Sequence, residues 1–192
     1  MALIIRQRKV VEDDWILVRA DAEEQLLAAD QLPEGRLLLP LALWQAVQGA
    51  LSVEATSRFG VWLAADDEPA LLAPDFARLS LVAVDFPLFR DGRGMSIGRL
   101  LRERYGWRGE LRAIGDVQRD QIGYMERCGF DSFAVPAERD IHDALNAFGE
   151  LTVRYQGGWD DPRPLFRRIE EGAQEAARVL APSAASNGAS AS

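Results

Sequence analysis

Apolar runs alternate with amphipathic stretches along the middle of the chain. The clearest strand is predicted over 79–86, where Leu81, Val82, Ala83 and Val84 form an unbroken apolar run. Such runs are typical of strands that are buried on both faces, as in a parallel sheet covered by helices. Strands are predicted to begin near residues 60, 79, 111, 131 and 151, with helices at about 69–78, 96–105, 117–128 and 137–148 between them. This alternation predicts an α/β fold whose parallel sheet is built from βα repeats.

The first 60 residues predict three more short strands, at 3–5, 15–18 and 37–39, and a helix at 41–52. Eight strand candidates invite comparison with a closed (β/α)₈ barrel. The N-terminal three mostly lack intervening helices, however, and such barrels typically need about 250 residues. An open or incomplete sheet is therefore favoured, with barrel-like closure as the alternative.

The C-terminal part differs in composition from the rest. Residues 1–158 are predicted to form a single α/β domain that ends at the glycine pair 157–158. An amphipathic pattern with two prolines near its start predicts a C-terminal helix at 159–180. Residues 181–192 are rich in alanine and serine, which predicts a disordered tail.

Composition excludes several function classes. The net charge of −8 argues against general nucleic-acid binding, which needs a basic surface. Cys128 is the one cysteine and His142 the one histidine, too few for a His/Cys zinc site or a cysteine-bound iron–sulfur cluster. Cys128 is predicted to pack in the core and His142 to lie on the surface. The longest apolar run, 37–44, is far too short to cross a membrane. These features predict a cytoplasmic protein that binds neither nucleic acid nor a membrane.

Two predicted strand ends carry the candidate chemistry, because ligands of parallel α/β folds bind at the carboxyl ends of strands. Residues 90–127 contain nine arginines and six acids within an acidic chain. The sequence therefore predicts a site for a small anion, in which two arginines hold the ligand, glycine and serine N–H groups approach it, and two aspartates orient the arginines. Its residues are Asp91, Gly92, Arg93, Gly94 and Ser96 after the first strand, with Asp116 and Arg119 after the next. The alternative is a salt-bridged turn followed by solvated helix faces, with Ser96 as a helix N-cap.

Three aspartates are candidate catalytic groups. Asp85, Asp116 and Asp120 lie at or after these strand ends, where carboxylates can bind Mg²⁺ or act as acid and base. The alternative is that Asp116 caps a helix and that Asp85 pairs with an arginine. No metal or other cofactor can be named from these residues.

Two strings in this region resemble a known family. They are Phe86-Pro87-Leu88-Phe89-Arg90-Asp91-Gly92-Arg93-Gly94-Met95-Ser96 and Gly109-Glu110-Leu111-Arg112-Ala113-Ile114-Gly115-Asp116-Val117, the second followed by Asp120-Gln121, Tyr124-Met125 and Arg127-Cys128-Gly129-Phe130-Asp131. The chain resembles a proteobacterial family labelled "oxidoreductase probably involved in sulfite reduction", whose genes accompany those of assimilatory sulfate and sulfite reduction. The resemblance is strong over 79–136 and looser over most of 10–156.

The resemblance implies a pathway and a partner, namely sulfite reductase or another enzyme of sulfate assimilation. Sulfite reduction needs iron–sulfur and haem-type cofactors, which one cysteine and one histidine cannot hold. The first expectation is therefore an accessory protein of the pathway that binds an anionic ligand. The alternatives are an enzyme of the βα class that uses Mg²⁺ or an organic cofactor, and a scaffold that docks onto a reductase subunit.

Overall fold

The computed structural model describes residues 2–19, 28–51 and 58–149. Eight strands form one sheet in the order β2-β1-β8-β7-β6-β5-β4-β3. In chain order the strands are β1 (Ala2–Arg6), β2 (Lys9–Asp13), β3 (Trp15–Leu17), β4 (Arg36–Pro40), β5 (Phe59–Leu63), β6 (Leu81–Phe86), β7 (Glu110–Gly115) and β8 (Ser132–Phe133). The α-helices are α1 (Leu41–Val47), α2 (Arg93–Glu103), α3 (Arg119–Arg127) and α4 (Ile141–Leu145). Short 3₁₀ helices are η1 (Ala29–Gln31), η2 (Gln48–Ala50), η4 (Pro69–Leu71), η5 (Ala73–Arg78) and η6 (Asn146–Gly149).

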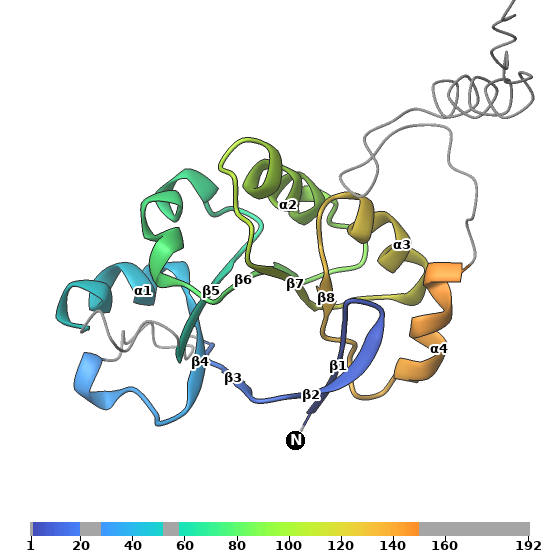
Figure 1. The fold of residues 1–192 in the computed structure, drawn as a ribbon, viewed down its shortest axis with the longest axis horizontal. Helices are drawn as coiled ribbons and strands as arrows, with labels where there is room; N and C mark the ends of the chain where they lie inside the picture. Colours follow the sequence, from blue (N-terminus) through green and yellow to red (C-terminus); the bar gives the residue numbers. More distant parts are fainter. Residues whose placement is uncertain (1, 20–27, 52–57, 150–192) are drawn as a thin grey trace, which may run out of the picture.

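The sheet is mostly parallel and nearly closed. Strands β3 to β8 are parallel to one another, whereas β1 is antiparallel to both of its neighbours, β8 and β2. The two edge strands, β2 and β3, are consecutive in the chain with Asp14 alone between them. The strands thus curve around a ring that has a seam at β2 and β3, and helices lie outside the ring from α1 past α2 and α3 to α4 (Figure 1). The predicted α/β class is confirmed, and both the incomplete sheet and the barrel-like alternative describe part of this architecture.

Two apolar clusters lie on opposite faces of the sheet. The larger one packs outward-facing strand residues against the helices and includes Trp44, Val84 and Phe130. The smaller one, enclosed by the curved sheet, contains Trp15, Leu38, Leu81, Ala83 and Ile114. Because successive strand residues point to opposite faces, a parallel strand covered on both sides is apolar throughout, which explains the unbroken run in β6.

A buried arginine connects the strands across the enclosed face. Arg112 on β7 is 2% exposed. Its guanidinium donates to both carboxylate oxygens of Asp13 at 3.0 and 3.1 Å, to Glu110 Oε1 at 2.7 and 3.1 Å and to Ser132 Oγ at 3.2 Å. Since Asp13 ends β2, this network joins the middle of the sheet to the strand at its seam.

The hairpin of β1 and β2 is held by a second set of contacts. Its two-residue turn, Gln7-Arg8, has φ of +49° and +61°, a left-handed conformation that favours glycine or asparagine. The backbone N–H of Gln7 donates to the Asp131 carbonyl at 2.8 Å, and Arg8 donates to both carboxylate oxygens of Glu126 at 2.8 and 2.9 Å. These bonds offset the strain of the turn and attach the hairpin to α3. They also border a hollow of about 350 Å³.

A further buried arginine fastens the loops around β7. Arg102 on α2 is 4% exposed and donates to the carbonyls of Trp107, Gly109 and Gly129 at 2.8–2.9 Å. It also donates to Asp131 Oδ2 at 3.0 Å. Burial lowers the pKa of Arg102 and raises the pKa of Asp131, and the ion pair between the two groups opposes both shifts.

Several predicted elements are shorter than expected. The helix predicted at 69–78 is divided into η4 and η5, since Pro74 lacks the N–H that a continuous helix needs. The segment 137–148 holds α4, which Asp140 caps by accepting from His142 N–H, followed by η6. Strand β2 was not predicted. The predicted strand near 151, the helix at 159–180 and the tail at 181–192 lie outside the described residues.

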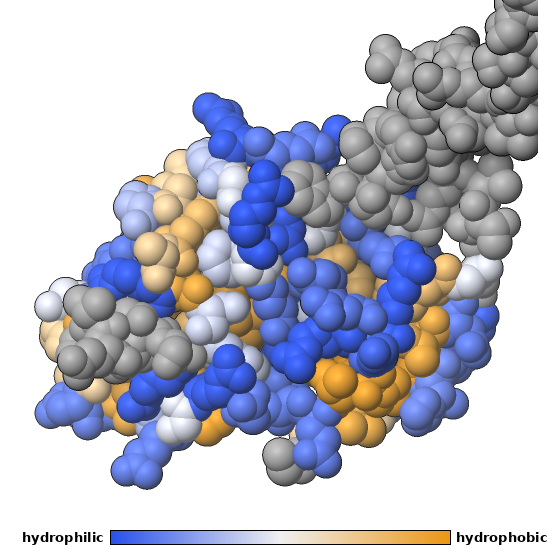
Figure 2. All heavy atoms as spheres, viewed as in Figure 1, coloured by the Kyte–Doolittle hydropathy of each residue, from blue (hydrophilic) through white to orange (hydrophobic). Residues whose placement is uncertain are grey.

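None of the described helices is long and apolar enough to span a lipid bilayer. The face in Figure 2 is hydrophilic over most of its area, with a hydrophobic patch at the lower right where Figure 1 places β1.

Candidate functional site

The loops that follow β6 and β7 meet at the carboxyl edge of the sheet. The Phe89 N–H donates to Asp116 Oδ2 at 3.1 Å, and the Phe89 carbonyl accepts from Gln121 Nε2 at 2.8 Å. The Asp116 N–H in turn donates to the carbonyl of Phe86 at 2.7 Å. The parallel pairing of β6 with β7 places both loops at this edge, so the two segments singled out in the sequence form one region.

Arg93 is held in place by two aspartates. Its Nε donates to Asp91 Oδ1 at 2.9 Å and its Nη2 to Asp91 Oδ2 at 2.7 Å, a two-pronged contact. Nη1 contacts Asp66, which follows β5. The contact with Asp91 raises the pKa of Arg93 and lowers the pKa of Asp91, because each stabilises the charged form of the other. Asp91 therefore fixes the direction of the Arg93 guanidinium, while its role in an anion site stays a prediction.

Asp116 and Arg119 both form polar contacts at this edge of the sheet. Asp116 accepts from Gln118 Nε2 at 3.2 Å and from Arg139 Nη2 at 3.4 Å, in addition to the N–H of Phe89. Arg119 donates to Asp143 Oδ1 at 2.9 Å. The N-cap residue of α3 is Gln118, so the alternative in which Asp116 caps this helix is wrong. Asp116 stabilises the preceding loop instead.

Gly92 and Gly94 of the first loop have different structural roles. A Cβ at Gly94 would lie 2.6 Å from the Phe86 ring, and one at Gly98 would overlap the Phe130 ring. Phe86 and Phe130 pack edge to face with centroids 5.7 Å apart beneath α2. Gly94 therefore permits close packing of helix on sheet. A Cβ at Gly92, the N-cap, would meet open space, with no heavy atom within 4 Å beyond its chain neighbours.

Alanine substitutions should separate these two glycines. We expect Gly94→Ala to lower the free energy of unfolding by about 1–3 kcal/mol, because its methyl group enters a packed core. Gly92→Ala is the matched control and should change stability by less than about 0.5 kcal/mol. Urea unfolding followed by circular dichroism measures both. Equal losses in the two variants would contradict the packing role of Gly94.

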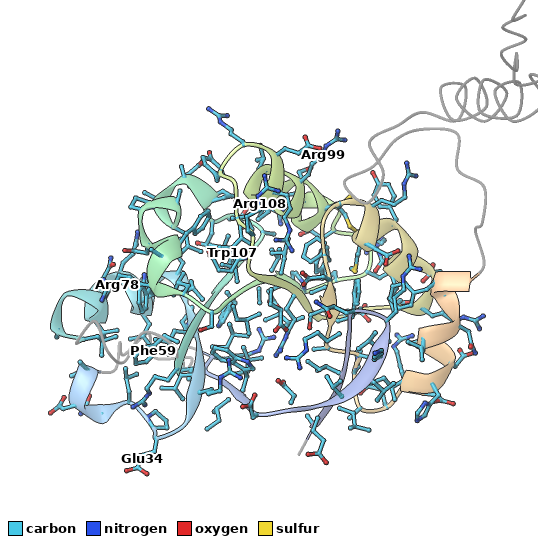
Figure 3. The ribbon with its side chains drawn as sticks, in the orientation of Figure 1. Glu34, Phe59, Arg78, Arg99, Trp107 and Arg108 are labelled. Carbon is cyan, nitrogen blue, oxygen red and sulfur yellow. The ribbon has the colours of Figure 1, made fainter. Side chains whose placement is uncertain are left out.

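Ser96 lies in the first turn of α2. Helix α2 begins at Arg93 with Gly92 as its N-cap, so the interpretation of Ser96 as the cap is wrong. Ser96 is exposed, and with other α2 residues it lines a shallow hollow of about 450 Å³, whose lining residues are Ser96, Arg99, Leu100, Glu103 and Arg104. Arg99 points away from the core (Figure 3).

Asp85 forms a half-buried ion pair that the sequence only partly predicts. Asp85 is 8% exposed, and it accepts from Arg19 Nη2 at 3.0 Å and Nη1 at 3.2 Å. The alternative that Asp85 pairs with an arginine is thus confirmed. Arg19 follows β3, and its guanidinium carbon lies 5.4 Å from the Trp62 ring centroid. Sequence reasoning missed Arg19, since nothing in its flanking residues connects it with a strand 66 residues away.

The other candidate groups do not converge on a metal. Within the described parts of the chain, no three histidine, cysteine, aspartate or glutamate side chains are arranged to bind one. Asp120 is exposed on α3, and His142 is exposed on α4. Cys128 is buried, as predicted, and burial raises the pKa of its thiol, which disfavours the nucleophilic thiolate. The carboxyl edge of the sheet presents guanidinium groups in fixed orientations, and such groups can recognise an anion.

Comparison with known proteins places the chain in a family without an assigned activity. No curated protein matches it. Residues 60–166 match the family described as "Bacterial protein of unknown function (DUF934)", and the match covers β5 to β8 with both loops of the carboxyl edge. Because it spans more than half of the 192 residues, the chain belongs to this bacterial family of unknown function.

Proposed function

We propose that the protein binds a small oxyanion at the carboxyl ends of β5, β6 and β7 and acts as an accessory protein of assimilatory sulfate and sulfite reduction. The observation that carries the proposal is the fixed guanidinium of Arg93. Asp91 holds its Nε and Nη2, while Nη1 is directed at Asp66, whose side chain is 86% exposed. Arginine held in this way has a defined donor direction before any ligand arrives.

An oxyanion can replace the exposed carboxylates at small cost. Asp66 and Asp143 are both largely solvent-exposed, and surface ion pairs of this kind contribute little to stability. A ligand that takes the place of Asp66 on Arg93, or of Asp143 on Arg119, exchanges one weak ion pair for another and gains any further contact at the edge. Asp91 is the better shielded partner, and it keeps Arg93 in place during the exchange.

The pathway assignment rests on the sequence resemblance described above. The composition of the chain favours an accessory role in that pathway, because the cofactors of sulfite reduction need more cysteine and histidine ligands than Cys128 and His142 provide. Binding of sulfite or a related oxyanion, or docking next to the enzyme that uses it, is compatible with this composition.

Single substitutions test the proposed site. We expect Arg93→Ala and Arg119→Ala each to weaken sulfite binding at least tenfold in isothermal titration calorimetry, because each removes one guanidinium from the edge. Arg99→Ala is the matched control: Arg99 lies on the same helix as Arg93, pairs with Glu103 at 2.8 Å, and points outward (Figure 3).

A strain that lacks the gene should fail to grow on sulfate and on sulfite as sulfur source but grow on sulfide. Of the proteins named here, the wild type and Arg99→Ala alone should restore its growth.

Two results would overturn the proposal. If the wild-type protein binds neither sulfite nor sulfate, the carboxyl edge is not an oxyanion site. If the deletion strain grows normally on sulfate and sulfite, the protein has no required place in this pathway.

A scaffold that docks onto a reductase subunit is the second candidate. Leu88 and Phe89 are exposed by 62% and 40%, and their loop is fixed through the backbone of Phe89 by Asp116 and Gln121. Exposed apolar side chains on a fixed loop can serve as anchors at a protein interface. Capture of sulfite reductase by the wild-type protein but not by Leu88→Ser, with no oxyanion bound, would favour this function.

A further inference from the structure

Arg19 is a rigidly presented arginine at the same edge of the sheet. The preceding residue, Val18, accepts a hydrogen bond from Trp62 Nε1 at 2.9 Å, and the Trp62 ring lies beneath the Arg19 guanidinium. The backbone N–H of Val18 donates to the Leu38 carbonyl at 2.9 Å. Backbone and side chain are therefore both held, although the Arg19 side chain itself is 49% exposed.

Asp85 fixes the direction of this guanidinium. Its carboxylate is buried against Gly115, where an added Cβ would lie 2.8 Å from Asp85 Oδ1. Gly115 has φ of +90°, so both its conformation and this close approach require glycine. Because the Asp85 carboxylate has little room to move, the Arg19 guanidinium that it binds is also held in one orientation.

A guanidinium has two edges that can each bind two oxygens. Asp85 occupies the end formed by Nη1 and Nη2. Among the described residues Asp85 is the one hydrogen-bond partner of Arg19, so the side edge formed by Nε–H and an Nη–H is unused there. Half of the Arg19 side chain is accessible to solvent, so a ligand can reach this residue from solvent.

We infer that Arg19 is a further ligand-binding residue and that its side edge selects an oxyanion with two neighbouring oxygens, such as sulfite, sulfate or a carboxylate. This inference rests on the proposed function, because Arg19 belongs to the carboxyl edge that contains Arg93 and Arg119. Asp85 positions Arg19 and Trp62 supports its flat face. A monatomic anion has one acceptor atom for both donors and cannot form two parallel hydrogen bonds, so the site should favour oxyanions over halides.

The chain offers an unusually close control for Arg19. Arg36 is also paired with an aspartate, Asp14, at 3.1 Å and also lies over a tryptophan, Trp15, at 4.2 Å. It begins β4, however, and is therefore at the amino end of the sheet. Substituting either arginine removes an aspartate ion pair and a tryptophan contact, but at opposite ends of the sheet.

Isothermal titration of the full-length protein with sulfite tests the inference. Arg19→Lys keeps the positive charge next to Asp85 but removes the Nε–H and Nη–H donors of the side edge. We therefore expect this variant to bind sulfite at least tenfold more weakly than the wild type. Arg36→Lys should bind like the wild type. Bromide at matched ionic strength should not displace sulfite. Arg19→Gln provides a second variant, and thermal melts show that each protein is folded before titration.

The outcomes separate this inference from the proposal on which it rests. Sulfite binding that is lost in Arg93→Ala but retained in Arg19→Lys overturns the role of Arg19 and leaves the oxyanion site standing. Displacement of sulfite by bromide overturns the two-oxygen selection. A wild-type protein that binds no oxyanion removes both.

Discussion

Replacing Arg112 with methionine should lower the free energy of unfolding by about 3–5 kcal/mol, the range for breaking a buried ion pair by removing one partner. The variant takes the arginine away from Asp13 and Glu110, which are 12% and 17% exposed, and leaves Glu110 with the weaker contact to Arg6 at 3.6 Å. It also removes the bonds that join β7 to β2 across the enclosed face. Urea unfolding of the purified protein measures the loss.

Arg36→Met is the control for this experiment. Arg36 forms an exposed ion pair with Asp14, so its loss should cost less than about 1 kcal/mol. The double variant Arg112→Met with Asp13→Asn should be more stable than Arg112→Met alone, because the amide carries no charge to be compensated. If Arg112→Met lowers the free energy of unfolding by no more than Arg36→Met does, the hydrogen-bond network of Arg112 does not stabilise the seam at β2 and β3.

Replacing Arg102 with methionine should have an effect of similar size, about 3–5 kcal/mol. Methionine fills much of the same volume but donates no hydrogen bond, so three backbone carbonyls lose a donor. Asp131 at the same time loses its ion-pair partner. Arg99→Met, on the same helix but exposed, should change stability by less than about 1 kcal/mol.

The loss in Arg102→Met should depend on pH. Burial already raises the pKa of Asp131 in the wild type, and removal of Arg102 raises it further. A carboxyl group whose pKa is raised by folding destabilises the protein above that pKa and ceases to do so once both states are protonated. The difference between wild type and variant should therefore be largest near neutral pH and shrink in acid. A loss that is constant from neutral pH into the acid range would contradict the role given to Asp131.

The parts of the fold that follow from local pattern could be predicted from the sequence. β6 and β7 are long and buried on both faces, and α2 and α3 have one apolar face each, so their signals lie within about ten residues. β2 was missed because its five residues hold only two apolar side chains among charges, and its strand conformation depends on β1. The nearly closed ring of strands depends on pairing between strands that are far apart in the sequence, such as β1 with β8. A local pattern of residues does not predict such pairing.

The arrangement of the candidate site residues was predictable to a similar extent. The rule that ligands bind at the carboxyl ends of parallel strands located both loops, and the structure brings them together. The roles of single residues were harder to predict. The sequence predicts that the Gly94 N–H approaches an anion, whereas the structure shows that glycine is needed there to pack against the Phe86 ring, and Arg19 pairs with an aspartate 66 residues away. Both facts depend on packing between segments that are distant in the chain.

The position of the seam has a consequence for the order in which the newly made chain can fold. β3 can pair with β4 once about 40 residues have left the ribosome, but β1 pairs with β8, which includes Phe133 opposite Ile5. The hairpin of β1 and β2 must therefore wait with unpaired backbone groups while more than a hundred further residues are synthesised. Pairings so distant in sequence form slowly, and exposed strand edges invite association with other chains during that time. Among the described elements, the N-terminal hairpin is synthesised first and can pair with β8 only after Phe133 has been made, so we expect chaperones to protect it during synthesis.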